Sequence, residues 1–417
     1  MKSARSNSMM NIKSEPSLVS TLLLIIGIIF IATNLRSPIT SVGPLIGMLR
    51  ENLAISNTVL GLITTIPLLA FGVFSSLSPK LARRMGMERL IFISLIILTI
   101  GIVVRSVAGE IMFFTGTILI GLAISVCNVL LPSLIKRDFE KNVGIMTGVF
   151  SVSMNLCGAI ASGISVPLAT EKNFGWNGAL GVWAILSFIS IFLWLPQLRN
   201  INKPQFIDIN KVNNTNFNIW KSPIAWNVTF FMGLQSLIFY VSVAWLPEIL
   251  NQKGFSTASA GWMLSLMQLA ILPITFFVPI LAGRMANQRI LVIMSSVFYL
   301  IGIFGLLYGG YLIIILSVIL IGIAMGSSFS LAMMFFSLRT KTSHLSAELS
   351  GMAQSIGYLF AAIGPTLFGI LHVVTKGWIV PLSLIMIAAI LLLITGLGAG
   401  RDAFIGLEKT DNKEVQQ

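Results

Sequence analysis

The sequence predicts an all-α integral membrane protein, with twelve transmembrane helices in two pseudo-symmetric six-helix bundles and both termini in the cytoplasm. Of the 417 residues, 56% are hydrophobic and only 10% are charged, with a mean hydropathy of +0.93. Soluble domains carry roughly 25% charged residues. Apolar runs long enough to cross a bilayer recur along the whole chain, and the two halves share a motif at a constant spacing.

Charged residues, Gly and Pro divide the chain into twelve apolar segments, each of roughly the 20 residues that a bilayer requires. A long polar linker, residues 199–221, follows the sixth segment and separates an N-terminal bundle, 18–198, from a C-terminal bundle, 222–400. Tails at 1–17 and 401–417 complete the expected organisation. The expected spans are 18–47, 57–79, 89–108, 111–135, 143–168, 175–197, 222–249, 258–282, 290–308, 311–337, 349–373 and 378–399.

The distribution of Lys and Arg predicts the orientation of these spans. With a cytoplasmic N-terminus, 21 of the 27 Lys and Arg residues fall in inner segments and four in outer loops, while Arg36 and Arg105 fall within spans. Inner loops of membrane proteins carry the excess of Lys and Arg. The first apolar run lacks a small-residue cleavage site, so we interpret it as a helix and not as a signal peptide. We therefore expect a multi-pass protein of the plasma membrane with both termini inside.

The two halves repeat the same pattern after the second and the eighth span. The segment from Pro79 to Arg89 aligns with the segment from Pro279 to Arg289, and six of its eleven residues are identical at an offset of 200. This pattern indicates duplication with the same orientation, which is a parallel repeat about an axis along the membrane normal. We expect the charged or flexible positions of these loops to take part in conformational change: Arg84, Gly86, Arg89, Arg284 and Arg289.

The charges exclude several classes of function. The formal charge of +13 comes from short clusters between apolar runs, so no basic domain for nucleic acid is predicted. The two cysteines, Cys127 and Cys157, lie in apolar segments and exclude a disulfide framework or a multi-cysteine metal site. No cluster of Asp, Glu, His or Cys has the spacing of a metal or catalytic site. We expect no cofactor and no enzymatic activity.

Arg36 is the strongest candidate for a functional residue. The repeat aligns it with Ser236, near the middle of the membrane, whereas all fourteen acidic residues fall in loops, tails or helix ends. A central arginine costs at least about 2.5 kcal/mol by insertion scales. Either the first helix ends near Leu35 and Arg36 reaches the outer surface, or Arg36 lines a cavity between the bundles and the substrate supplies its counter-charge. Arg105 is expected to be an interfacial anchor, with a functional role as the alternative.

Other polar groups could complete a binding site. On the seventh span, Ser236 and Tyr240 share one helical face, with Gln235 and Trp245 beside it. Trp245 could equally belong to the outer aromatic belt. Isolated polar residues in other spans could bind substrate or hold helices together. The candidate substrate-binding residues are Arg36, Asn34, Gln235, Ser236, Tyr240, Trp245, Asn128, Gln354 and Tyr358, and Asn155 and Gln268 are further isolated polar groups.

The chain resembles the cyanate transporter and 2-nitroimidazole transporter family within the major facilitator superfamily. The resemblance extends from about residue 20 to 400. The loop after the second span is also similar to the superfamily's signature, although Pro79 replaces its first Gly and Arg83 its Asp, which removes the usual Asp-mediated contact. The motifs that carry the resemblance are Asn34-Leu35-Arg36, Thr40 to Leu45, Pro132 to Arg137, Ala244 to Pro247, Gln354 to Tyr358, and Gly364-Pro365.

The resemblance implies a secondary transporter that moves a small polar or anionic solute by alternating access. A broad exporter of drugs or metabolites is the alternative, but such a site favours a membrane-embedded carboxylate that the spans lack. Outside the transporters, the alternative function is a polytopic membrane enzyme or receptor. Uniport, exchange and coupling to a proton all remain open, and we expect the protein to be a monomer in the lipid bilayer.

Overall fold

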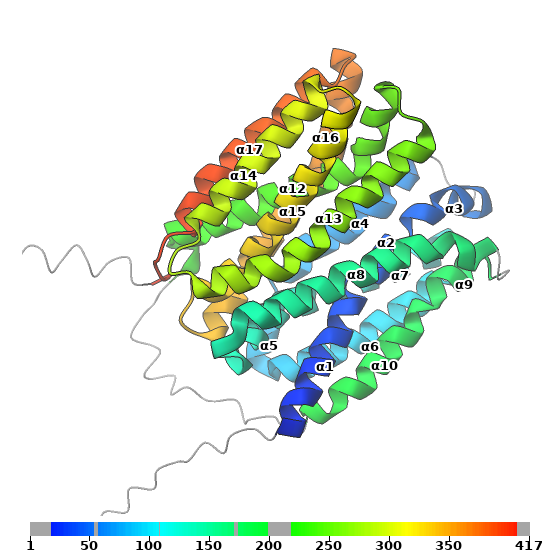
Figure 1. Cartoon of the computed structure of the whole chain (residues 1–417). Helices are drawn as coiled ribbons and strands as arrows, with labels where there is room; N and C mark the ends of the chain where they lie inside the picture. Colours follow the sequence, from blue (N-terminus) through cyan, green and yellow to red (C-terminus); the bar gives the residue numbers. More distant parts are fainter. Residues whose placement is uncertain (1–17, 54–56, 108, 171–173, 199–217, 407–417) are drawn as a thin grey trace, which may run out of the picture.

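The computed structural model describes residues 18–53, 57–107, 109–170, 174–198 and 218–406, and every regular element in this part of the chain is helical (Figure 1). The expected N-terminal tail lies outside the described residues, as do most of the linker (199–217) and the end of the C-terminal tail (407–417). Eleven of the described helices are long and apolar enough to cross a membrane, and a pair bent by 51° makes a twelfth. The prediction of an all-α membrane protein with about twelve spans is confirmed.

The first half of the chain forms one group of helices, here called the N-bundle (Figure 1). Its second span is the bent pair, α4 and α5, where the sequence predicted a helix followed by a loop. The elements are α1 (Leu18–Asn34), α2 (Ser37–Thr40), η1 (Gly43–Leu45), α3 (Ile46–Leu53), α4 (Asn57–Ser75), α5 (Ser78–Met85), α6 (Met87–Arg105), α7 (Glu110–Asp138), η2 (Glu140–Asn142), α8 (Val143–Thr170), α9 (Gly175–Gly181), α10 (Trp183–Trp194) and η3 (Leu195–Leu198).

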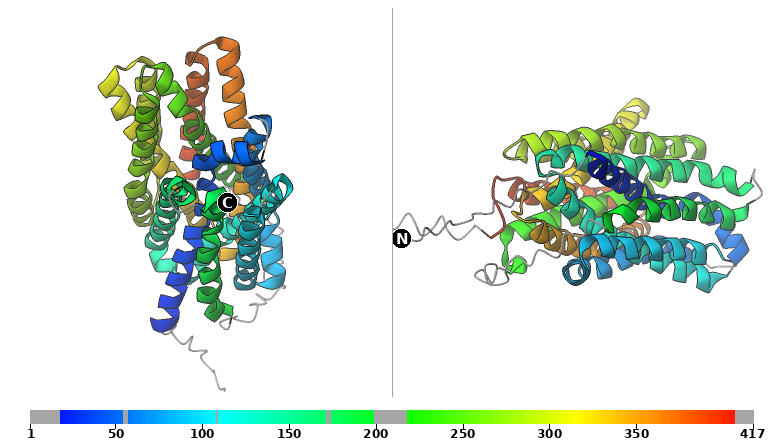
Figure 2. Two further views of the ribbon diagram at one scale, coloured as in Figure 1. Left: turned by 90° about the vertical axis from the view of Figure 1, so that its right-hand side faces the viewer. Right: turned by 90° about the horizontal axis from the view of Figure 1, so that it is seen from below.

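The second half forms the C-bundle, and its long helices run in roughly the same direction as those of the N-bundle (Figure 2). The eleventh span begins at Ser343, six residues before the expected position, because Thr342 caps it by accepting a hydrogen bond from the backbone N–H of Leu345. The elements are η4 (Ile219–Lys221), α12 (Pro223–Gln252), α13 (Thr257–Arg284), α14 (Arg289–Tyr308), α15 (Tyr311–Leu338), α16 (Ser343–Thr375) and α17 (Ile379–Ala399).

The two bundles pack their helices in the same pattern. In the N-bundle, α1 packs on α8 and α10, and α7 packs on α4 and α6. The equivalent pairs in the C-bundle are α12 with α16 and α17, and α15 with α13 and α14. Between the bundles, α8 packs against α13 and α4 against α16, which are again equivalent pairs. The arrangement agrees with the internal repeat of the sequence.

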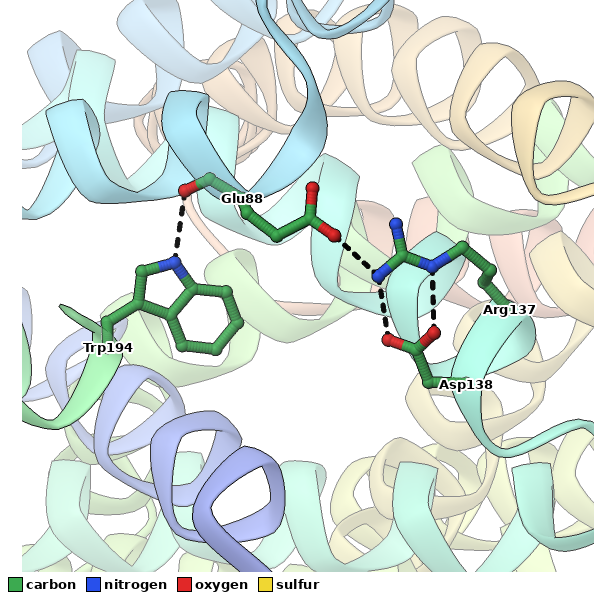
Figure 3. A network of polar contacts seen from close by, with 4 residues as sticks. All are labelled: Glu88, Arg137, Asp138 and Trp194. Carbon is green, nitrogen blue, oxygen red and sulfur yellow. Dashed lines mark hydrogen bonds and ion pairs between the residues drawn. The ribbon is translucent and has the colours of Figure 1, made fainter. Parts of the chain in front are cut away.

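Equivalent polar contacts tie together one end of each bundle. In the N-bundle, Arg137 at the end of α7 lies 2.7 Å from the carboxylate of Glu88, whose backbone carbonyl accepts a hydrogen bond of 3.0 Å from the indole of Trp194 (Figure 3). Arg137 also pairs with the neighbouring Asp138 at 2.8 Å. This end carries the start of α6 and the ends of α7 and α10. We call it, with the matching end of the C-bundle, the terminal face.

The C-bundle repeats this arrangement with a neutral partner. Gln288 stands 200 residues after Glu88 and accepts a hydrogen bond from the guanidinium of Arg339, which also donates to the carbonyl of Ala399 at 2.7 Å. Burial lowers the pKa of Arg339 to about 10, so the side chain keeps its charge at neutral pH. The arginine therefore holds the end of α17 against the end of α15.

The two bundles are joined directly on the terminal face. The Lys136 ammonium donates to the carbonyl of Ser337 at 2.5 Å and also to that of Thr340, so a side chain of the N-bundle caps the last turn of α15. Arg83 on α5 pairs with Glu348 on α16 at 3.0 Å. These cross-bundle contacts close the terminal face in this structure.

A glycine allows the backbones of α8 and α13 to approach closely at this closure. A Cβ atom added at Gly144 would stand 2.5 Å from the carbonyl oxygen of Pro279, whereas one added at Gly163, further along α8, would have nothing within 4 Å. Gly144→Ala should therefore separate the helices and cost about 1–3 kcal/mol of stability. Thermal unfolding in detergent measures this loss. The control, Gly163→Ala, should be neutral or more stable by up to about 1 kcal/mol, and equal behaviour of the two variants would contradict the packing argument.

Candidate functional site

The first span is broken at Arg36, where the sequence predicted a continuous helix from 18 to 47. Pro38 has no N–H and its ring would clash with the carbonyl four residues earlier, which belongs to Asn34. Accordingly α1 ends at Asn34, and α2 begins at Ser37 with Pro38 in its first turn. Arg36 stands between the two helices in a non-helical conformation, with φ −121° and ψ −37°. Arg36 therefore lies outside the regular turns of both α1 and α2.

Arg36 points into a cavity between the bundles. Its Nη1 donates a hydrogen bond of 2.5 Å to Oδ1 of Asn155 on α8, and its guanidinium lies 4.6 Å from the ring centre of Phe239 on α12. The cavity is small, with a volume of only about 20 Å³. Its lining consists of Arg36, Asn155, Gln235, Ser236, Phe239, Tyr240, Ile271, Met325, Phe329 and Tyr358.

The charge of the cavity is not balanced by the protein. Among the residues that line it, Arg36 carries the only formal charge, and no Asp or Glu is present. The amide of Asn155 and the face of Phe239 stabilise the guanidinium by a hydrogen bond and a cation–π contact, without neutralising it. The arrangement can therefore accept a small group that carries negative charge or exposes acceptor oxygens. Of the two interpretations of Arg36, the early end of the first helix is found, because α1 ends at Asn34. The side chain of Arg36 nevertheless lines this cavity, as the other interpretation expected.

The structure brings five of the nine candidate binding residues together. Gln235 and Ser236 lie side by side, with the Gln235 amide donating to the Ser236 hydroxyl at 2.7 Å. Tyr240 and Tyr358 enter from α12 and α16, and the ring of Tyr358 packs against Phe71 at a centroid distance of 5.0 Å. The five residues in the cavity are Arg36, Gln235, Ser236, Tyr240 and Tyr358.

The other four candidates lie outside the cavity and make structural contacts. Asn34 is fully buried and donates to the hydroxyl of Ser190 at 2.8 Å, which joins α1 to α10. Gln354 donates to the backbone carbonyl of Asn128 at 3.0 Å, so these two candidates belong to the junction between the bundles. The indole of Trp245 donates to the carbonyl of Pro365 at 2.9 Å, which joins α12 to α16 within the C-bundle.

Sequence reasoning missed part of the cavity. It recognised Asn155 only as an isolated polar group, and the pairing with Arg36 depends on two segments 119 residues apart. Phe239 gave no signal, because an aromatic residue in an apolar run is ordinary in a membrane span. Phe239 nevertheless is the aromatic residue whose ring faces the Arg36 guanidinium, and it directly precedes the predicted residue Tyr240.

The candidate loop residues have separate environments on the terminal face. Gly86 connects α5 to α6 with a φ of +85°, a conformation that favours glycine, and Arg289 donates to the carbonyl of Leu397 at 3.2 Å. Arg84, Arg89 and Arg284 have exposed side chains. The ion pair between the bundles at this loop comes instead from Arg83, the residue that replaces Asp in the signature-like segment.

Arg105 is buried, which contradicts its expected place as an interfacial anchor. It is 2% exposed, and its Nη1 donates to the carbonyl of Pro38 at 2.6 Å, while Nε and Nη2 have no partner in the part of the chain that the structure describes. The carbonyl of Pro38 thereby receives a hydrogen bond, although the short helix α2 supplies no backbone N–H for it. Arg105 supports the backbone immediately after Arg36.

A family model described as the Major Facilitator Superfamily matches residues 22–365 of the chain. The chain is similar to an uncharacterized transporter, YycB, of Bacillus subtilis, with 48% identity over 92% of this chain and 94% of that protein. It is also similar to two proteins of Escherichia coli. A 2-nitroimidazole transporter is 40% identical over 91% of this chain and 96% of its own length, and the cyanate transport protein CynX is 24% identical over 84% and 90%.

Solved structures show the same fold at low identity. The structure of the proton:xylose symporter XylE bound to 6-bromo-6-deoxy-D-glucose superposes with a TM-score of 0.73 and 13% sequence identity, covering 93% of this chain and 98% of that one. At this identity the likeness concerns the fold alone.

The contact between Arg36 and Asn155 can be measured without knowing a ligand. Asn155→Leu should lower the unfolding free energy by about 1–3 kcal/mol, because a charged donor loses its partner. In a protein that already carries Arg36→Met, Asn155→Leu should lower the unfolding free energy much less. The two substitutions should therefore show a coupling energy of at least about 1 kcal/mol in a double-mutant cycle. Denaturant or thermal unfolding of the four proteins in one detergent gives the value. Additive effects would show that the pair does not interact.

Proposed function

The chain belongs to the Major Facilitator Superfamily of membrane transporters, and from this premise we propose that it is a secondary active transporter that moves a small polar or anionic solute past Arg36 by alternating access. The observation that carries the proposal is the guanidinium in the central cavity, which no carboxylate of the lining neutralises. The solute would supply the missing negative charge or acceptor oxygens. A planar guanidinium fork is suited to carboxylate-like and nitro-like groups, because it offers parallel donors.

The size and lining of the cavity favour a small and flat solute. The cavity volume is only about 20 Å³, so a bulky drug would need large rearrangements of the two bundles. Phe239 and Tyr240 offer aromatic faces next to the charge, and the hydroxyl of Ser236 and the amide of Gln235 offer polar contacts. The names of two relatives, a 2-nitroimidazole transporter and a cyanate transport protein, describe solutes of this kind. We propose the same class here, without choosing between the two.

The closed terminal face supports alternating access. On the terminal face, Lys136 and Arg83 of the N-bundle each contact the C-bundle. In the central cavity, Arg36 of the N-bundle contacts Phe239 of the C-bundle. We propose that the terminal face is cytoplasmic, because most Lys and Arg residues fall on the side of the two termini. The structure then corresponds to a state that is closed toward the cytoplasm. Transport would break the contacts of Lys136 and Arg83 as the bundles rock.

Coupling to a proton stays a prediction. No Asp or Glu lines the central cavity, so a proton-binding carboxylate next to the solute is not available there. The XylE structure belongs to a protein named as a proton symporter, but at 13% identity this name carries no coupling mechanism to the present chain. If a proton is moved, it would travel on the solute itself. A monomer stays our expectation for the functional unit.

The two alternative functions lack a comparable observation. A broad exporter of lipophilic cations would need negative charge in the cavity, and the only charged side chain of the lining is an arginine. A membrane enzyme would need a catalytic cluster. No group of three or more His, Cys, Asp or Glu residues in the described ranges is placed to hold a metal ion. We therefore propose the small-solute transporter alone.

Replacement of the cavity arginine tests the proposed function. Uptake of labelled cyanate, nitrate and 2-nitroimidazole into proteoliposomes should show which of them the protein moves, while a lipophilic cation should not enter. Arg36→Gln should lower uptake of the accepted solute by roughly 10- to 100-fold, because a hydrogen bond to a charged group contributes about 1.5–3 kcal/mol. Arg36→Lys should keep part of the activity, since the charge remains but the fork is lost.

Arg50→Gln serves as the matched control, because Arg50 lies on α3 of the same broken span but has an exposed side chain. This variant should transport like the unchanged protein. Equal uptake by Arg36→Gln and Arg50→Gln, with both proteins inserted and folded, would refute the role of Arg36. Transport of the lipophilic cation would favour the exporter instead.

A further inference from the structure

A second cavity, here called the seam cavity, lies on the terminal face between the bundles. It is formed where α7 and η2 lead into α8, and where α13 and α15 end, so both bundles contribute to its walls. It is much larger than the central cavity, with a volume of about 460 Å³. Lys136, Lys141, Arg284 and Lys341 line it, with Glu140 as the only carboxylate of the lining.

Three of the four cations have neither an acidic partner nor a role in joining the bundles. The fourth, Lys136, donates to backbone carbonyls at the end of α15. Lys141, Arg284 and Lys341 have exposed side chains, and within the described ranges no carboxylate lies at ion-pair distance from any of them. The ammonium of Lys341 lies 5.9 Å from the ring centre of Phe404. The seam cavity therefore carries an excess of positive charge.

The positions of these cations oppose closure of the two bundles. Lys141 belongs to the N-bundle, whereas Arg284 and Lys341 belong to the C-bundle. Charges of the same sign repel each other across the gap when the terminal face is closed. A group with several anionic oxygens, placed between them, would turn this repulsion into attraction to both sides. Phosphate has this chemistry.

The location of the cavity indicates the source of the phosphate. Its walls are the ends of membrane-spanning helices, which is the depth at which lipid headgroups lie. Ile145 of the lining, on α8, exposes 43% of its apolar side chain, and Leu281, the chain neighbour of the lining residue Ile280 on α13, exposes 50%. Basic pockets between transmembrane helices bind the headgroups of anionic lipids.

We propose that the seam cavity binds the headgroup phosphate of an anionic phospholipid from the leaflet on the terminal face, and that this lipid bridges Lys141 of the N-bundle to Arg284 and Lys341 of the C-bundle. The bound lipid stabilises the closed terminal face. This inference does not depend on which solute the central cavity accepts, and it adds a second ligand at a separate site.

Native mass spectrometry of the full chain in detergent tests the proposal with phosphatidylglycerol and phosphatidylcholine as probes. The unchanged protein should bind phosphatidylglycerol roughly 10- to 100-fold more tightly, as expected for three basic residues near one phosphate. The triple variant Lys141→Gln, Arg284→Gln, Lys341→Gln should lose this preference. A matched triple variant, Lys80→Gln, Arg89→Gln, Lys221→Gln, removes the same charge from exposed positions outside the cavity and should keep it.

A second measurement needs no variant. Phosphatidylglycerol should raise the unfolding temperature of the unchanged protein more than phosphatidylcholine does, and high salt should reduce the difference. Equal effects of the two lipids, or an undiminished preference in the first triple variant, would overturn the proposal. If inorganic phosphate or glycerol phosphate gives the same stabilisation at similar concentration, the site takes a soluble anion and the assignment to lipid is wrong.

Discussion

The organisation of the central cavity depends on one constraint, which is that a guanidinium inside a membrane protein must have polar surroundings. A charged side chain at the bilayer centre costs at least about 2.5 kcal/mol. The chain meets this constraint by breaking the first span at Pro38, so that Arg36 turns toward Asn155 and Phe239 between the bundles. No carboxylate of the lining pairs with Arg36, and under the proposed function this leaves the charge available to a solute.

The sequence predicted the spans well, because hydropathy and the positions of charged residues determine which segments can cross a bilayer. An end of the first helix near Leu35 is one of the two interpretations that the sequence offers, and Pro38, four residues after Asn34, explains it. The cavity lining was harder to predict. Asn128 and Gln354 look like binding residues in an apolar run, yet the side-chain amide of Gln354 joins the two bundles by donating to the backbone carbonyl of Asn128. The partner of Arg36 is set by packing between distant helices, which no local pattern encodes.

The internal repeat has been kept on the terminal face and lost in the cavity. Arg137 with Glu88 and Arg339 with Gln288 occupy equivalent places and hold the helix ends of their bundles together. In the cavity, by contrast, the repeat sets Arg36 opposite Ser236, so the cation comes from the N-bundle while the C-bundle supplies a hydroxyl, an amide and aromatic rings. Under the proposed function, the symmetric ends would allow the bundles to rock as equivalent bodies, and the asymmetric centre would allow them to recognise one orientation of a solute.

The sign of the cavity charge also links the cargo to the direction of transport. Moving one elementary charge across the membrane changes the energy by about 2.3 kcal/mol per 100 mV. With the terminal face in the cytoplasm, as proposed, the inside-negative potential opposes the entry of an anion and favours its exit. Arg36 does not change this balance, because it stays with the protein and only stabilises the anion while it is bound. Under the proposed function, uptake of an anion against this potential therefore needs a steep inward gradient, a co-transported cation or exchange for an internal anion, whereas a neutral nitro-heterocycle, held by its acceptor oxygens, could enter along its own gradient.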